Sequence, residues 1–388
     1  MDHAGLIYLD NAATTFPKPK AVNEAVWDCL TRWCGNAGRS SHALAMAAAE
    51  RTYDCRCLAA QLFGVSEAER VFFTLNTTHG LNTVIKGLLR PGDHVLISDL
   101  EHNAVYRPIY KLAAEGRITY DIFRSMTGDP RQNATRICAG IARLLRPNTR
   151  LLVCTHASNI CSATLPIRQI GAFCHRHGIF FVVDGAQSAG HEPIAVDDMQ
   201  IDALCVPGHK GLYGPQGCGM VILGKKVSPQ TLIEGGNGVD SLAGEMSGDT
   251  PERYEAGTLP LPAIAGLYEG MRAISSVGIK AIAEHERTLC RAARTLLLQI
   301  PTVELYAPDY EGTTLLFHLQ HMPSDAVGNC LNEYGICVRS GYHCAPLAHR
   351  TLRTPEDGAV RISFGMYNRM SEVEALASAL KKLAKNSL

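Results

Sequence analysis

Hydrophobic and polar residues in the middle of the chain alternate between two kinds of block. Short apolar runs have the length and composition of buried strands, and the longer stretches between several of them have the periodicity of amphipathic helices ending near a glycine or proline. Strands that alternate with helices predict βαβ units and a mainly parallel, seven-stranded sheet with helices on both faces. We expect strands at 71–74, 94–98, 119–123, 150–154, 179–184, 203–206 and 219–223, and helices at 41–63, 80–89, 134–145 and 167–177.

The pattern changes after about Leu259. A long helical stretch at 263–300 is followed by strands at 313–319 and 360–363 and by helices at 324–334 and 371–385. These elements predict a smaller α+β domain made of 1–15 and 261–388, beside a large domain at 16–260. The glycine-rich, polar segment 235–258 is expected to be a long surface excursion with a functional or interface role.

Composition narrows the class of protein. Of 388 residues, 46% are hydrophobic and 19% charged, so the chain can bury a large core. Basic and acidic residues both number 37, which argues against a nucleic-acid partner. No apolar run is long enough for a membrane span, and the N-terminus does not resemble a secretory signal, so we expect a cytoplasmic protein. The 14 cysteines include no C-x-x-C pair, which favours buried thiols over a zinc or thioredoxin site.

Three motifs lie at the ends of predicted strands. Lys210 occupies the glycine-rich loop 206–219, where a partly desolvated lysine could form an imine, although such a lysine alone is usually a solvated turn residue. Asp184 ends an apolar run and could either pair with a pyridinium nitrogen or cap a helix. Thr77 and Thr78 begin a helix, where hydroxyls and free amides form either a phosphate site or an ordinary cap. Together the three motifs point to pyridoxal phosphate.

Further motifs extend this pattern over nearly the whole chain. In order they are LDNAATT (9–15), TTHGLN (77–82), SDLEHNA (98–104), VDGAQ (183–187), GHK (208–210), YEAGT (254–258) and RSGYHC (339–344). With them the chain resembles the fold-type I pyridoxal-phosphate enzymes of the class V aminotransferase family, and within it the cysteine desulfurases. The GHK and RSGYHC blocks resemble those of the second desulfurase group, which includes selenocysteine lyase-like enzymes.

The resemblance implies roles for the cofactor site. Lys210 would form the imine, Asp184 would pair with the pyridine nitrogen, and His102 would act in catalysis while stacking on the ring. Such enzymes are typically homodimers with shared active sites, so Thr258 would reach the phosphate of a neighbouring subunit. The remaining cofactor contacts implied are Thr77, Thr78, Asn159, Gln187 and His209.

The substrate side of the site is implied in the same way. Arg361 would hold the substrate carboxylate as a two-pronged fork, with Arg339 in the same pocket and the turn from Asn11 to Ala13 at its border. Cys344 would be the nucleophile that carries a persulfide. Its position near Arg339, His343 and His349 predicts a thiol stabilised as thiolate by cations. A metal site formed by His343, Cys344 and His349 is the alternative, but no second cysteine cluster completes it.

The activity implied is conversion of L-cysteine to L-alanine, with sulfur passed from Cys344 to an acceptor protein for sulfur mobilisation such as iron–sulfur cluster assembly. Alternatives are a lyase acting on L-selenocysteine and a class V aminotransferase without persulfide chemistry, for which Cys344 is unnecessary. A non-catalytic scaffold would be expected to have lost Lys210 or Asp184. Three positions depart from the family pattern: Pro207 replaces a phosphate-donating Ser or Thr, Gly211 is inserted, and His79 replaces an acid.

Overall fold

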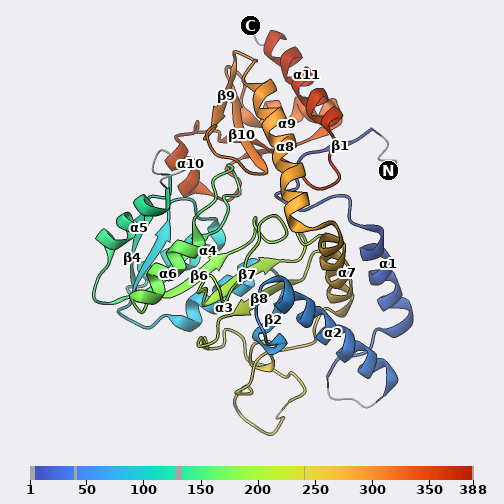
Figure 1. Cartoon of the computed structure of the whole chain (residues 1–388), viewed down its shortest axis with the longest axis vertical. Helices are drawn as coiled ribbons and strands as arrows, with labels where there is room; N and C mark the ends of the chain where they lie inside the picture. Colours follow the sequence, from blue (N-terminus) through green and yellow to red (C-terminus); the bar gives the residue numbers. More distant parts are fainter. Residues whose placement is uncertain (1–4, 39–41, 127–132, 240, 387–388) are drawn as a thin grey trace.

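The structure is a computed structural model that describes residues 5–38, 42–126, 133–239 and 241–386. Its centre is a seven-stranded sheet in the order β2-β8-β7-β6-β5-β3-β4 (Figure 1). Only β8 runs antiparallel to its neighbours, so the sheet is mainly parallel, as predicted. The strands are β2 (Val71–Thr74), β3 (His94–Ser98), β4 (Thr119–Phe123), β5 (Thr149–Thr155), β6 (Phe180–Asp184), β7 (Ala203–Pro207) and β8 (Gly219–Leu223).

Helices cover both faces of this sheet because its strands are apolar on both sides. In β3, Val95 and Ile97 belong to one hydrophobic cluster while Leu96 belongs to the other, as the two-residue period of a strand requires. The first cluster also takes side chains from α3 (Thr77–Leu88) and α4 (Asn103–Ala114). The second takes them from α2 (Ala43–Leu62), α5 (Asn133–Leu144), α6 (Ile167–Arg176) and α7 (Leu261–Val277).

A second, four-stranded sheet lies in the C-terminal part of the chain, at the top of Figure 1. It is antiparallel, in the order β12 (Arg339–Gly341), β13 (Ala359–Ser363), β10 (Thr314–Leu319) and β9 (Val303–Tyr306). The N-terminal strand β1 (Ile7–Tyr8) pairs with β11 (Ile336–Cys337), and Leu9 is buried in the same core. The helices of this part are α8 (Ile279–Leu297), α9 (Ser324–Glu333), α10 (Pro346–Leu352) and α11 (Met370–Asn386).

The helical elements differ from the sequence prediction in several places. The single helix expected at 263–300 is two helices, because Gly278 has φ of 93° and ψ of 124°, outside the helical region. Helix α1 (Lys20–Asp28), which lies beside α7 in Figure 1, was not expected, and neither were α4 and α10. Residue 41, where the sequence placed one helix start, lies outside the described residues; that helix begins at Ala43.

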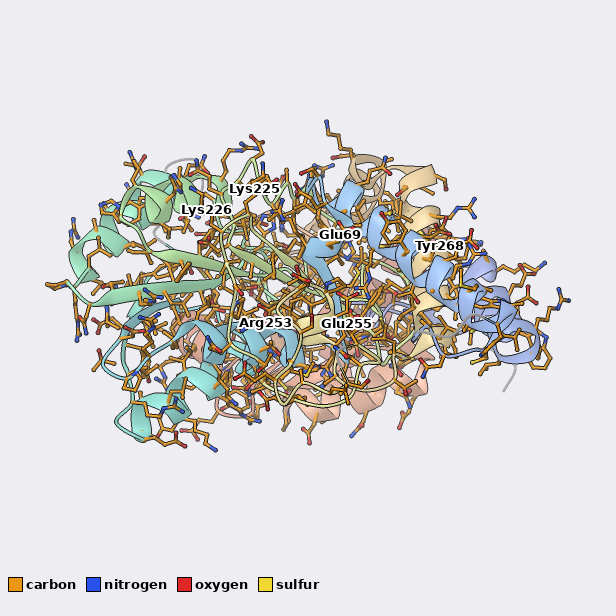
Figure 2. All side chains as sticks on the ribbon, turned by 90° about the horizontal axis from the view of Figure 1, so that it is seen from below. Glu69, Lys225, Lys226, Arg253, Glu255 and Tyr268 are labelled. Carbon is orange, nitrogen blue, oxygen red and sulfur yellow. The ribbon has the colours of Figure 1, made fainter. Side chains whose placement is uncertain are left out.

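The segment 235–258 is largely irregular in its described residues, as expected, apart from a short 3₁₀ turn at Glu252–Tyr254. Its Glu255 is nonetheless buried and forms a two-pronged ion pair with Arg56 of α2, at 2.7 and 2.6 Å. In Figure 2, which shows the molecule from below, Arg253 and Glu255 lie near the middle of the view, with Glu69 above Glu255 and with Lys225 and Lys226 toward the upper left. None of the described helices has the length and apolar character needed to cross a membrane.

Candidate functional site

A cavity of about 330 Å³ lies at the carboxyl ends of the large sheet. Strands β2, β3, β5, β6 and β7 run in the same direction, so the loops that follow them meet at one edge, where open α/β sheets bind ligands. The C-terminal part closes the opposite side. Predicted site residues that line the cavity are Ala13, Thr77, Thr78, His102, Asn159, Asp184, Gln187, His209, Lys210, Arg339, Cys344 and Arg361.

Lys210 follows β7, and the N-terminal segment holds its loop in place. The carbonyl oxygen of His209 accepts hydrogen bonds from the Lys18 ammonium at 2.7 Å and from the Thr15 amide at 3.2 Å. The Thr15 hydroxyl also donates to the carbonyl of Lys210 at 3.0 Å. These bonds tie the backbone on both sides of the lysine, so its side chain projects from a fixed base.

The charge of Lys210 is set by its surroundings. Burial lowers the pKa of its amine to about 8; Asp184 opposes this effect, whereas Arg361 and Arg339 add to it. Part of the amine is therefore unprotonated near neutral pH, the form that reacts with a carbonyl group.

Close packing explains why position 211, the inserted residue, is a glycine. A Cβ atom there would lie 2.2 Å from the carbonyl oxygen of Ala189 and 2.6 Å from Nε2 of His191. Burial alone would lower the pKa of His191, but Glu286, at 2.6 Å from Nδ1, raises it overall. A buried ion pair thus lies directly behind the lysine loop.

Asp184 ends β6 and is 2% exposed. Its Oδ1 accepts a hydrogen bond from the amide of Ala186 at 2.9 Å. Burial raises the pKa of this carboxyl, while the Ala186 amide and Lys210 pull it back down. A buried carboxylate of this kind favours a cationic partner. Gln187, close behind it, donates from Nε2 to the carbonyl of Ala12 at 2.9 Å and so ties the N-terminal turn to the cavity wall.

His102 is the N-cap residue of α4, a role that its motif alone did not predict. Its Nδ1 accepts a hydrogen bond from the amide of Ala104 at 3.0 Å, so the proton of the neutral ring lies on Nε2. Burial, followed by the charges of Lys210 and Arg361, lowers its pKa to about 4. The ring is therefore a neutral, fixed wall of the cavity.

Unpaired polar atoms mark one end of the cavity. The Thr77 hydroxyl and Nδ1 of His209 are buried without a hydrogen-bond partner. Thr77 begins α3, whose first amides have no partner within the helix. Burial and the neighbouring lysines Lys210 and Lys18 lower the pKa of His209 to about 4. Pro207, which also lines the cavity, has no N–H to donate. These donors fit a phosphate group, which would satisfy the orphaned atoms.

The two arginines face each other across β12 and β13, where Arg339 pairs with Arg361. Arg361 is 3% exposed and already engaged: Nη2 donates to the Asp10 carboxylate at 2.6 Å and Nη1 donates to the Asn159 carbonyl at 2.9 Å. Its Nε has no partner. Arg339 is exposed. Asp10 was not among the predicted site residues, although it lies inside the LDNAATT motif.

Cys344 is one of two exposed thiols among the fourteen cysteines; the other is Cys34. Its carbonyl accepts from the amide of Asn103 at 2.7 Å. The expected cationic histidines beside it are not found: burial lowers the pKa of His343 to about 3 and that of His349 to about 4, so both are neutral. Within the described residues no group of His, Cys, Asp or Glu side chains is arranged to hold a metal ion.

Two predicted residues lie away from this cavity. Asn11 donates from its amide to the carbonyl of Ser363 at 3.2 Å and to Oδ1 of Asn368 at 3.1 Å, and so anchors the N-terminal turn. Thr258 is exposed and lines a separate cavity of about 830 Å³ beside Arg56 and Glu255.

Two residues near the site, Lys18 and Glu101, were not predicted from the sequence. Burial raises the pKa of the Glu101 carboxyl to about 8, and the nearby charge of Asp184 adds to this effect. Glu101 could have been singled out, since it precedes His102 in SDLEHNA.

Comparison with known proteins agrees with this arrangement. The model of the family described as aminotransferase class-V matches residues 7–376. The chain belongs to the class V aminotransferase family. Among similar relatives of this family, a cysteine desulfurase of Klebsiella pneumoniae (strain 342) is 34% identical over 98% of this chain and 94% of that protein. A cysteine desulfurase of Escherichia coli (strain SE11) is 32% identical over 97% of this chain and 93% of that protein.

Solved structures of two cysteine desulfurases have the same fold. The apo cysteine desulfurase of Thermococcus onnurineus NA1 matches with a TM-score of 0.87 and 28% identity, over 98% of this chain and 95% of that one. The cysteine desulfurase CsdA of Escherichia coli, in an S-sulfonic acid form, matches with a TM-score of 0.85 and 26% identity, over 99% and 96%.

Proposed function

We propose that the chain is a pyridoxal-phosphate-dependent cysteine desulfurase that releases L-alanine from L-cysteine and keeps the sulfur as a persulfide on Cys344. The observation that carries this proposal is one cavity lined by an amine of lowered pKa, a buried carboxylate and an exposed thiol, contributed by Lys210, Asp184 and Cys344. The names of the relatives support the same reaction.

The residues present fit the cofactor. Thr77, Thr78, His209 and the first amides of α3 would hold its phosphate, Asp184 would pair with the ring nitrogen, and Lys210 would bind its aldehyde carbon. His102 would lie against the ring, with Gln187 and Asn159 near its edge. Bound in this way, pyridoxal phosphate supplies an electron sink for the substrate's α-carbon.

The chain's own residues account for the remaining steps. Arg361 and Arg339 attract the substrate carboxylate, and the Ala13 turn, anchored by Asn11, borders it. The Lys210 amine would be the base that accepts the α-proton of the substrate. The Cys344 thiolate then attacks the substrate sulfur. A sulfur–sulfur bond forms, the carbon–sulfur bond breaks, and its electron pair stays on the substrate β-carbon, which takes a proton.

The proposal extends to partners and location. We infer a homodimer, because Thr258 is exposed on a separate cavity where it could face a second copy rather than its own active site. The exposed Cys344 suits transfer of its sulfur to an acceptor protein, as in sulfur mobilisation for iron–sulfur clusters. A cytoplasmic location suits a chain whose cysteines are all free thiols.

The decisive experiment compares the two exposed thiols. Purified protein with pyridoxal phosphate, L-cysteine and a thiol reductant should form alanine and sulfide in equal amounts. Cys344→Ala should abolish this turnover, whereas Cys34→Ala, which removes the other exposed thiol, should leave it unchanged. Undiminished release of alanine and sulfide by Cys344→Ala would overturn the assignment. Parallel assays with L-selenocysteine separate a desulfurase from a selenocysteine lyase.

A further inference from the structure

A chain of hydrogen-bonded side chains lies behind Cys344 and has no part in the steps above. His343 Nε2 lies 3.0 Å from the carbonyl oxygen of Arg339, and His343 Nδ1 lies 3.2 Å from Nε2 of His349. At the far end, His349 Nδ1 lies 2.8 Å from the hydroxyl of Thr354. The two imidazole rings are nearly parallel, with planes 6° apart. The backbone of β12, the turn that follows it, α10 and the loop after α10 are thereby connected.

The direction of every bond in this chain follows from its first member. A carbonyl oxygen only accepts, so Nε2 of His343 carries the proton. Burial lowers the pKa of His343 to about 3, so the ring is neutral and its Nδ1 must accept from His349 Nε2–H. Burial likewise keeps His349 neutral, with a pKa of about 4, so its Nδ1 accepts from the Thr354 hydroxyl. Each histidine is thus held in one tautomer.

The backbone beside this chain has an unfavourable conformation. His343 and Cys344 have φ of 50° and 55°, a left-handed pair of consecutive non-glycine residues. A left-handed conformation is unfavourable for residues other than glycine and persists only when the surroundings hold it. The Asn159 amide holds the carbonyl of His343 at 2.7 Å, and the Asn103 amide holds that of Cys344 at 2.7 Å. The ring of His343 is held by His349.

We propose that His349, oriented by Thr354, is a positioning residue for sulfur transfer. It fixes the ring of His343 and thereby the left-handed turn that presents the Cys344 thiol to the cavity. This role rests on the proposed desulfurase function. Neither His349 nor Thr354 lines the cavity, so their loss should affect the step at the thiol and not the binding of substrate or cofactor.

Two pairs of variants test this role. His349→Leu removes both hydrogen bonds, whereas His349→Gln keeps an N–H donor near the position of Nε2. Thr354→Val removes the hydroxyl at constant shape, whereas Thr354→Ser keeps it. We expect kcat for alanine formation to fall on the order of tenfold in His349→Leu and less in Thr354→Val, with KM unchanged. The kcat of His349→Gln and of Thr354→Ser should stay close to that of the unmodified chain.

Hydrogen exchange of the peptide that contains residues 342–346 gives a readout independent of turnover. Exchange should be faster in His349→Leu than in His349→Gln, because the turn loses a support. Equal exchange in these two variants, unchanged kcat in His349→Leu, or an equal loss in Thr354→Ser and Thr354→Val would overturn the inference. Absence of alanine formation by the unmodified chain would instead refute the proposed function, and the exchange comparison would still test the turn.

Discussion

The carboxylate of Asp10 lies 2.6 Å from Nη2 of Arg361, the arginine proposed to hold the substrate carboxylate. A substrate must therefore compete with an internal carboxylate or use the remaining donors of the guanidinium. The pairing joins the N-terminal turn to β13 across 351 positions of sequence. It also offsets the repulsion between two arginines on neighbouring strands.

Substitution of Asp10 should change substrate binding in a predictable direction. Asp10→Asn keeps an acceptor for Nη2 but removes the competing charge, so KM for L-cysteine should fall, by roughly fivefold if about 1 kcal/mol is regained. Asp10→Ala removes the acceptor as well and should raise KM, because Arg361 loses its orientation. Initial-rate kinetics on the two variants provide the check, and a raised KM in Asp10→Asn would show that Asp10 does not compete with substrate.

The lowered pKa of Lys210 predicts how cofactor uptake depends on pH. The unprotonated amine is the reactive form, and with a pKa of about 8 its fraction rises through pH 8 and levels off above it. A lysine of ordinary pKa, about 10.4, would continue to gain reactivity above pH 9. The measurement is the rate of imine formation, followed by visible absorbance as pyridoxal phosphate is added to cofactor-free protein. Plotted against pH, this rate should have its midpoint near pH 8 rather than near the pKa of an ordinary lysine.

A matched variant tests the electrostatic cause. Arg339 is one of the cations that lower the Lys210 pKa. Arg339→Gln should therefore move the midpoint of imine formation to higher pH, while Lys210→Ala should form no imine. A midpoint that is the same with and without Arg339 would contradict a contribution of Arg339 to the lowered pKa of Lys210.

The buried ion pair between Arg56 and Glu255 should be important for stability. Glu255→Ala leaves the guanidinium of Arg56 buried without a counter-charge and removes the acceptor of the Phe73 amide, 2.6 Å away. We expect a loss of about 3–5 kcal/mol in the free energy of unfolding, measured by chemical denaturation. Asp198→Ala, which breaks an exposed pair with Arg168, is the control and should cause no measurable change. Equal effects in the two variants would contradict this account.

Much of the fold and the site could be predicted because both rest on local patterns. Buried strands such as 71–74 and 219–223 stand out as apolar runs between turns, and the ends of parallel strands necessarily meet at one edge, which brings Asp184 and Lys210 together. Helix α4 was missed because Pro108 lies inside it, where proline normally interrupts a helix. The break at Gly278 was missed because the apolar periodicity continues on both sides of it.

Long-range pairings could not be predicted from one sequence. The contacts of Lys18 with the His209 carbonyl and of Asp10 with Arg361 depend on how the N-terminal segment crosses the molecule. The charge of His343 and His349 could not be predicted either, because neighbouring positions in sequence suggest cations beside Cys344, whereas burial makes both rings neutral. The position of Thr258 outside the cavity of its own chain was suggested by the family resemblance alone, because no local pattern in the sequence indicates it.

The central claim is that Cys344 receives sulfur from L-cysteine in a reaction that depends on Lys210. Mass spectrometry of peptides after brief incubation with L-cysteine, without reductant, tests it most directly. We predict a mass gain of one sulfur atom on the peptide that contains Cys344, no gain on the peptide that contains Cys34, and no gain anywhere in Lys210→Ala. An unmodified Cys344 in a protein that still forms alanine, or a persulfide that forms equally well in Lys210→Ala, would contradict the account.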